Sequence, residues 1–556
     1  MSRPPTQHAP IVRSNTLEAV FIDPDDPLQS RQDLPKVIKH ARVTYDDTST
    51  PISSPRLERF SKIIFPRPSH PLQPARISEW TNIGSFPSPL QNNPSQLNLG
   101  LSFVGSRETI LVDIISDAEN TTMSRELVRA GPRKELAFHP SNQARPCIVT
   151  CGGLCPGLNS VIRELVMTLK KMYRVSRVDG IPFGYRGFYS THMTIAELTE
   201  ERVCDIHHEG GSIIGSSRGG HDTKRICDSI VAMGYNQIFI IGGDGTHRGA
   251  VKIFEELKRR RVMASVVGIP KTIDNDIALI DKSFGFDTAV EEAQRSIKCA
   301  KIEAKSAING IGLVKLMGRH SGQIAMFATL ASRDVDCCLI PEVHFELDGK
   351  AGLFQYIEDT LRRKGHMVIV VAEGAGLELI EREIESSDFD ESGNKKLSDV
   401  GLWLKTHIVS DFRMRGREIN LKLIDPTYEI RSVPANASDN LHCSLLAQSA
   451  VHGAMHGFSG FSVGMINTHF VLIPMEEICR RGRTKVDVKS RMWHRVIATT
   501  MQPSLSGESS HHGASMHGLI EALDGSLTFR NANSNSVFKP ASQPTVFEPD
   551  EDSEDE

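Results

Sequence analysis

The sequence lacks features that define several classes of protein. No apolar stretch approaches the roughly 18 residues that a membrane-spanning helix requires, and the longest runs, such as residues 367–372, have the length of a buried strand. The 64 basic and 68 acidic residues nearly cancel, which excludes a histone-like polycation and gives no reason to expect a nucleic-acid partner. Ten cysteines spread over 556 residues are typical of reduced thiols rather than of a disulfide framework. We therefore expect a cytoplasmic protein without membrane or nucleic-acid partners.

The two ends of the chain differ in composition from its middle. Residues 1–94 contain 15 of the 29 prolines, which resist helix formation, so we expect residues 1–85 to be a disordered tail. Acidic residues such as Asp23 and Asp26 within it argue against a transit peptide. We also expect a Ser/His-rich and finally acidic C-terminal tail at 501–556. Seven acidic residues lie within 548–556, and without them the net charge is +3 instead of −4.

Between these tails, short apolar runs alternate with amphipathic stretches. The runs at 147–151, 237–241, 264–269 and 367–372 each end in a turn rich in Gly, Asp or other polar residues. Apolar strands that alternate with helices indicate a parallel sheet with helices on both faces. Ligands of such folds bind at the carboxyl ends of the strands, so the turns are the expected location of the chemistry.

Three turns carry side chains suited to phosphate chemistry. In GGDGT (242–246), glycines and a helix N-terminus can accept a phosphate and Asp244 can bind Mg²⁺, although a plain capped turn is the alternative. In PKTIDND (270–276), a carboxylate, a hydroxyl and a cation follow a strand. In LMGRHSG (316–322), Arg319 can neutralise a transferring phosphoryl group, whereas His320 is interpreted as structural. The set favours phosphoryl transfer, and the lack of Walker and protein-kinase motifs leaves the small-molecule kinases.

Taken in order, the motifs resemble the ATP-dependent 6-phosphofructokinases, in particular the plant- and trypanosome-like group related to pyrophosphate-dependent enzymes. The resemblance covers about residues 147–500 and implies an α/β fold of two Rossmann-like lobes with parallel-rich sheets and an active site in the cleft between them. It implies an N-terminal extension at 86–146, an ATP lobe mainly at 147–285 and a sugar-phosphate lobe mainly at 286–435, after which the chain crosses back. A homo-oligomer, dimer or tetramer, is implied as well. The matching segments are GGLCPGLNSVIREL (152–165), FGYRGF (183–188), GSSRGG (215–220), GGDGTHRGA (242–250), PKTIDNDI (270–277), GFDTAVEEA (285–293), LMGRHSG (316–322), AEGAG (372–376) and DPTYEIRSVPANASD (425–439).

The resemblance implies transfer of the γ-phosphoryl group of Mg-ATP to the 1-hydroxyl of fructose 6-phosphate. Asp274 would accept the hydroxyl proton with support from Thr272 and Asp276, and Arg319 and Lys271 would stabilise the transferring group. The implied ATP site comprises Gly152, Arg218, Gly219, Gly243, Asp244, Gly245 and Thr246, with Asp244 as the Mg²⁺ ligand. The implied sugar-phosphate site comprises Thr272, Ile273, Asp274, Met317, Gly318, Arg319, Glu373, Lys422, Tyr428 and Arg431.

Two positions bear on the phosphoryl donor. Pyrophosphate-using relatives carry Asp at the position of Gly245, where it would repel the α-phosphate of ATP, so Gly favours ATP. Lys271 is instead typical of pyrophosphate users, but the plant-like ATP group combines both residues. Bacterial relatives place an arginine at the position of Gly310, so their tetramer and allostery cannot be transferred.

Three alternative functions stay open. A pyrophosphate-dependent phosphotransferase is disfavoured by Gly245, and an NAD or lipid kinase would not explain PKTIDND. A non-catalytic regulatory subunit would be expected to have lost Asp274 or Arg319, and the sequence keeps both.

Overall fold

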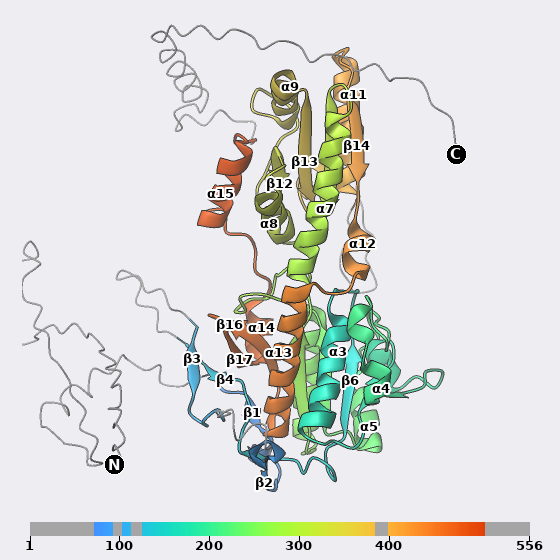
Figure 1. The fold of residues 1–556 in the computed structure, drawn as a ribbon, viewed down its shortest axis with the longest axis vertical. Helices are drawn as coiled ribbons and strands as arrows, with labels where there is room; N and C mark the ends of the chain where they lie inside the picture. The colour runs from blue at the N-terminus through green and yellow to red at the C-terminus, as the bar shows by residue number, and fades with distance from the viewer. Residues whose placement is uncertain (1–71, 93–102, 113–124, 384–397, 506–556) are drawn as a thin grey trace, which may run out of the picture. The chain divides into compact units, whose positions relative to one another are not determined.

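The computed structural model describes residues 72–92, 103–112, 125–383 and 398–505 of the chain (Figure 1). The predictions for residues 1–71 and 506–556 therefore lie outside the described residues. Two sheets organise the described part, one of nine strands and one of four.

The nine-stranded sheet has a parallel centre and antiparallel edges. The strand order is β3 (Thr109–Leu111), β4 (Glu126–Arg129), β17 (His469–Pro474), β16 (Phe461–Ile466), β10 (Ser265–Pro270), β9 (Gln237–Gly242), β6 (Pro146–Thr150), β7 (Asp179–Ile181) and β8 (Ala196–Glu197). The centre consists of the parallel neighbours β7, β6, β9, β10 and β16. Every residue of β6, β9 and β10 is buried, as expected of parallel strands covered on both faces.

Helices cover both faces of this sheet. Ile148 of β6 packs in one core with α3 (Leu158–Met167) and α13 (Ala437–Met455). Its neighbours in β6 point to the opposite face and pack in a second core with α5 (Thr223–Met233) and α6 (Asp244–Arg259). The alternation along a strand thus separates two apolar cores, which is why these strands are apolar throughout.

The four-stranded sheet is parallel throughout, in the order β12 (Cys337–Leu339), β13 (His366–Ala372), β11 (Gly310–Leu316) and β14 (Asn420–Ile424). Its residues divide between a core shared with α7 (Phe286–Lys305) and α8 (Gln323–Ser332) and a core shared with α9 (Leu353–Lys364) and α11 (Val400–Met414). The first of these cores also contains the β6, α3 and α13 side chains of the large sheet. One continuous core therefore joins the two sheets.

Gly310 is explained by the packing of α7 on β11. A Cβ at this position would lie 2.0 Å from the carbonyl oxygen of Ala304, and one at Gly312 would lie 2.6 Å from that of Ala300. Neither distance is possible without moving backbone. An arginine at position 310 is therefore incompatible with the close approach of this helix to its strand.

The described fold is larger at both ends than predicted. Residues 72–85 were expected to be disordered, yet β1 (Ala75–Arg76) pairs with β15 (Phe458–Ser459) and Ile77 is fully buried. At the other end, the Gln502 side chain bonds both backbone groups of Cys338, at 2.7 and 3.1 Å, and Leu505 is buried. The boundaries at 85 and 501 were wrong because isolated anchoring residues in polar, proline-containing segments leave no periodic pattern.

The remaining elements are short or peripheral. They are β2 (Phe86–Pro87), β5 (Glu135–Leu136), α4 (Glu200–Val203), α10 (Leu377–Glu383), α12 (Thr427–Ser432), α14 (Met475–Arg481), α15 (Arg491–Thr500), the 3₁₀ turns at Ile77–Glu79, Pro89–Asn92, Gly184–Phe188 and Ile206–His208, and a π-helical turn at Thr168–Met172. None of the helices in the described part of the chain has the length and apolar character needed to cross a membrane.

Candidate active site

A cavity of about 580 Å³ lies where the carboxyl ends of the two sheets face each other. The large sheet contributes the loops after β6, β9 and β10, three adjacent parallel strands. The small sheet contributes the loops after β11 and β13, and α12 adds Thr427 and Arg431. Parallel pairing is what brings loops that are more than 100 residues apart in the sequence to one place.

The loop after β9 forms one wall of the cavity. Gly243 is the N-cap of α6, and Asp244, Gly245 and Thr246 form the first turn of this helix. Free N–H groups at a helix N-terminus suit a phosphate. A Cβ placed on Gly245 would meet nothing within 4 Å, so space is open beside this turn.

Asp244 is the candidate magnesium ligand. Its carboxylate pairs with Arg248, one turn further along α6, and lies 3.9 Å from Nε of Arg483. No group of three or more His, Cys, Asp and Glu side chains that could hold a metal occurs within the described residues. Mg²⁺ is usually held by one or two carboxylates together with substrate phosphates. The residues therefore fit an ion that arrives with phosphates, not a metal site built by protein alone.

Asp274 has the position and environment of a general base. It lines the cavity, and its Oδ1 has no hydrogen-bond partner within the described residues. Burial raises the pKa of Asp274, the nearby Asp276 and Glu373 carboxylates raise it further, and the Arg483 and Lys271 cations oppose the rise. A buried carboxylate with a free oxygen can accept a proton from a substrate hydroxyl.

The neighbours of Asp274 fix the loop around it. The Thr272 hydroxyl donates to Asp276 Oδ1 at 2.8 Å and accepts from the Asp274 backbone N–H at 3.2 Å. Asn275 has a φ of +53°, and its side-chain oxygen accepts from the Ser283 N–H at 2.9 Å. Ser283 in turn donates its hydroxyl to the Thr272 carbonyl at 2.6 Å. The loop is thus closed on itself by side chains rather than left to adapt to its ligand.

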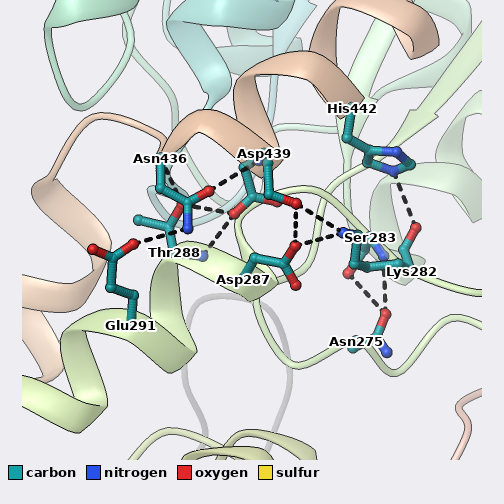
Figure 2. A network of polar contacts seen from close by, with 10 residues as sticks. Asn275, Lys282, Ser283, Asp287, Thr288, Glu291, Asn436, Asp439 and His442 are labelled. Atoms are coloured by element: carbon teal, nitrogen blue, oxygen red, sulfur yellow. Dashed lines mark hydrogen bonds and ion pairs between the residues drawn. The ribbon is translucent and has the colours of Figure 1, made fainter. Parts of the chain in front are cut away.

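A buried polar network holds this loop to the helices that join the sheets (Figure 2). Asp439 at the start of α13 is fully buried and accepts from both the N–H and the hydroxyl of Thr288 on α7, at 2.7 and 2.6 Å. Asn436 caps α13 and donates its N–H to the same hydroxyl. On the loop side, His442 of α13 donates to the carbonyl of Lys282 at 3.2 Å. The network therefore fixes α13, α7 and the Asp274 loop relative to one another.

Lys271 connects two walls of the cavity. Its side chain is buried, and Nζ donates to the Gly153 carbonyl at 2.8 Å, in the loop after β6. Burial lowers the pKa of Lys271. Gly152, in the same loop, has a φ of +91°, which favours glycine, and a Cβ there would be in ordinary contact with this Nζ at 3.4 Å.

The small sheet supplies the opposite wall. Met317 and Arg319 follow β11, and Glu373 follows β13. Gly318 between them has a φ of +131°, and a Cβ there would lie 2.5 Å from the Ser321 carbonyl oxygen, so only glycine fits. Burial raises the pKa of Glu373. Arg431 adds a guanidinium whose Nε is buried without a hydrogen-bond partner in the described part of the chain, which suits an anionic ligand.

Residues 145–454 match the sequence profile of a family described as Phosphofructokinase. The chain belongs to the phosphofructokinase family. It is 54% identical over 458 residues to the ATP-dependent 6-phosphofructokinase 7 of Arabidopsis thaliana, covering 82% of this chain and 93% of that one. It is 52% identical over 432 residues to the chloroplastic ATP-dependent 6-phosphofructokinase 4 of the same plant, covering 77% and 81%. The family and the plant-like group predicted from the motifs are therefore confirmed.

The fold is confirmed by a solved structure. The crystal structure of a pyrophosphate-dependent phosphofructokinase from Marinobacter aquaeolei superposes with a TM-score of 0.53 over 66% of this chain and 92% of that chain. Its sequence identity is only 18%, so the likeness concerns the fold alone. The predicted α/β architecture with parallel-rich sheets agrees with both the strand pairing and this neighbour.

Most of the predicted site residues lie together in this phosphofructokinase. Gly318 does not line the cavity itself but lies between two residues that do. Two others are not brought to it: Lys422 is exposed on the edge strand β14, and Tyr428 is 76% exposed, with the Arg431 guanidinium 5.0 Å from its ring centroid. The predicted residues that line the cavity are Gly152, Arg218, Gly219, Gly243, Asp244, Gly245, Thr246, Lys271, Thr272, Ile273, Asp274, Met317, Arg319, Glu373 and Arg431.

Sequence reasoning missed several residues of the cavity. His320, which the sequence predicts to be structural, also lines the cavity, where burial and the neighbouring Arg483 and Arg319 lower its pKa. Arg248 is one helical turn beyond Asp244, so the spacing of four within GGDGTHRGA could have revealed it. Arg483 comes from the far end of the chain and belongs to no motif.

Proposed function

We propose that this phosphofructokinase transfers the γ-phosphoryl group of Mg-ATP to the 1-hydroxyl of fructose 6-phosphate, giving fructose 1,6-bisphosphate and ADP. One observation carries the proposal: Asp274, a buried carboxylate whose Oδ1 has no hydrogen-bond partner among the described residues, shares a cavity with Arg319 from the other sheet and with the helix N-terminus at Gly245. A base, a phosphoryl-stabilising cation and a phosphate-binding turn are the parts that phosphoryl transfer requires.

In this proposal the nucleotide phosphates lie against the first turn of α6 and the glycine of the β6 loop. Magnesium that arrives with the nucleotide, held by Asp244, would neutralise phosphate charge. The sugar lies toward Met317, Glu373 and Arg431, with its 1-hydroxyl beside Asp274. The hydroxyl oxygen forms a bond to the γ-phosphorus as the bond to the bridging oxygen of ADP breaks, and Asp274 takes the proton. Lys271 and Arg319 stabilise the charge that spreads over the equatorial oxygens.

ATP is the proposed donor because of Gly245. The space beside this residue is open, as a nucleotide requires, and a side chain there would enter it. Lys271 would serve either donor, since it is a buried cation between two phosphate-facing loops. Both Arabidopsis relatives carry ATP-dependent names, which supports the same choice.

An aldolase-coupled assay with ATP and with pyrophosphate tests the proposal. We expect turnover with Mg-ATP and fructose 6-phosphate and little with pyrophosphate. Turnover with pyrophosphate alone would replace the donor, and no turnover with either would favour the non-catalytic regulatory subunit.

Compartment and assembly belong to the proposal as well. We propose a cytoplasmic homo-oligomer, although one relative is named chloroplastic. A fluorescent fusion of the full chain and light scattering of the purified protein test the two statements. Lys422 and Tyr428 stay predicted sugar-phosphate contacts that a single chain does not place at the cavity.

A further inference from the structure

A segment near the C-terminus passes the catalytic loop on its way from one sheet to the other. Residues 482–490, here called the crossing segment, leave α14, which packs on α6, and lead into α15, which packs on α8 and β12. Arg483 forms a β-bridge with Ile277, and the Thr484 N–H donates to the Asp276 carbonyl at 2.7 Å. The Val486 N–H donates to Glu342 at 2.7 Å. The backbone of the crossing segment is therefore fixed beside Asp276 without help from the Arg483 side chain.

This anchoring directs the Arg483 side chain into the cavity. Its Nε lies 3.6 Å from Asp276 Oδ2 and 3.9 Å from Asp244 Oδ2, and 34% of the side chain is exposed. Both distances exceed the length of a good N–H···O hydrogen bond. The guanidinium therefore sits between two carboxylates of the phosphoryl-transfer site by charge attraction, without the two-pronged geometry of a tight Arg–carboxylate pair.

The two carboxylates do not depend on Arg483 alone. Asp276 accepts the Thr272 hydroxyl at 2.8 Å, and Asp244 pairs with Arg248. When a magnesium ion takes up the Asp244 charge, the attraction of this carboxylate for a guanidinium falls. An arginine held loosely in a cavity that also presents Lys271 and Arg319 then has phosphate oxygens as its best acceptors, because its planar donors match them.

We propose that Arg483 is a further catalytic residue of the phosphoryl-transfer site, whose guanidinium contacts the transferring γ-phosphoryl group. Before substrate binds it balances Asp244 and Asp276, and in the substrate complex it turns to the phosphate. The inference rests on the proposed function. It assigns to the C-terminal crossing segment a part in chemistry that the motifs of the phosphofructokinase family do not include.

Two substitutions and one matched control test the inference. Arg483→Gln removes the positive charge, and Arg483→Lys keeps the charge without the planar guanidinium. Both substitutions leave the backbone hydrogen bonds of the crossing segment unchanged. The control is Arg480→Gln, three residues earlier, because Arg480 pairs with Glu477 on α14 and does not line the cavity. For each variant we would measure kcat, the KM of both substrates, the melting temperature, and the affinity for Mg-ADP and for Mg-β,γ-methylene-ATP by titration calorimetry.

We expect Arg483→Gln to lower kcat by about 10²–10³-fold, in the range found when one transition-state donor is removed. Affinity for the methylene analogue should fall about tenfold while affinity for ADP and the KM of fructose 6-phosphate stay within twofold. Arg483→Lys should retain more of the wild-type kcat than Arg483→Gln does. Arg480→Gln should match the wild type in kcat, KM and nucleotide affinity.

Three results would overturn the inference. In the first, Arg483→Gln keeps the wild-type kcat and analogue affinity. In the second, Arg483→Gln loses ADP affinity as much as analogue affinity, which would place the contact elsewhere on the nucleotide. An equal loss for Gln and Lys, together with a lowered melting temperature, would make the side chain structural. If the wild-type protein shows no ATP-dependent turnover, the proposed function fails, and the comparison of analogue with ADP still decides whether Arg483 contacts the terminal phosphate.

Discussion

The substitution Gly245→Asp should convert an open nucleotide site into one that repels ATP. Gly245 lies in the first turn of α6, its backbone is not left-handed, and a Cβ there meets nothing within 4 Å. An aspartate can therefore be introduced without strain, and its carboxylate enters the space proposed for the nucleotide. Aspartate is also favourable in the first turn of a helix, so the fold should not be weakened.

The size of the effect follows from the charge that is added. A carboxylate about 5 Å from a phosphate oxygen, at an effective dielectric of about 20, is repelled by about 3 kcal/mol. Since about 1.4 kcal/mol corresponds to a factor of ten, kcat/KM for ATP should fall by about 10²-fold. Pyrophosphate, which has no α-phosphate or nucleoside in that space, should be affected much less.

The coupled assay with each donor measures this change, and two further variants separate its causes. Gly245→Ala should leave ATP kinetics nearly unchanged, because the Cβ has room. Gly245→Asn has the size of Asp without its charge, so the difference between Asn and Asp gives the electrostatic part. Unchanged ATP kinetics in Gly245→Asp, with a normal melting temperature, would refute the assignment of this space to the nucleotide.

Four further predictions concern the catalytic loop and its support. Asp274→Asn should lower kcat about 10²–10⁴-fold with little change in the KM of fructose 6-phosphate in the coupled assay, and near-normal kcat would remove Asp274 from its role. Because burial raises the pKa of Asp274, kcat/KM should rise with pH through that raised pKa, and the buried carboxylate should destabilise the fold above its unfolded pKa of about 4. Asp274→Asn should thus melt about 2 °C or more above the wild type near pH 7.5, and the gain should vanish near pH 4. Thr288→Val leaves Asp439 without its hydroxyl donor and should cost about 1–3 kcal/mol in urea unfolding, whereas Thr288→Ser, which keeps the hydroxyl, should cost less.

One rule of parallel sheets predicts part of the cavity, and the family resemblance predicts most of its other residues. Asp244 and Asp274 follow adjacent parallel strands of the large sheet, whose carboxyl ends meet at one edge, and Arg319 follows an apolar strand of the small sheet. Local signals of this kind survive in a single sequence, since the strand, the turn and the functional side chain are adjacent. Glu373, which the resemblance assigns to the site, likewise follows the apolar strand β13.

Residues that reach the site through long-range packing could not be predicted. Thr288 and Asp439 are 151 residues apart, and no sequence pattern in either segment predicts the hydrogen bonds between them. Arg483 depends on the path of the crossing segment between α14 and α15, which no periodicity encodes. Ile77 is one apolar residue in a proline-rich segment, and only the structure shows the core that it enters. In each case the contact is made by tertiary packing, not by neighbours in the chain.

The charges of the cavity explain how one site can hold four carboxylates and still bind two anionic substrates. Asp244 and Asp276 lie beside guanidinium groups, and burial raises the pKa of Asp274 and of Glu373, which shifts both toward their neutral forms. The negative charge that these carboxylates present to an arriving phosphate is thereby reduced. Mg-ATP and fructose 6-phosphate are both anionic, so their phosphates would compete with Asp244 and Asp276 for the arginines of the cavity. Since the Arg483 and Lys271 cations oppose the rise in the Asp274 pKa, moving Arg483 to a phosphate would change that pKa, which is why the Arg483 and Asp274 variants are best measured over a range of pH.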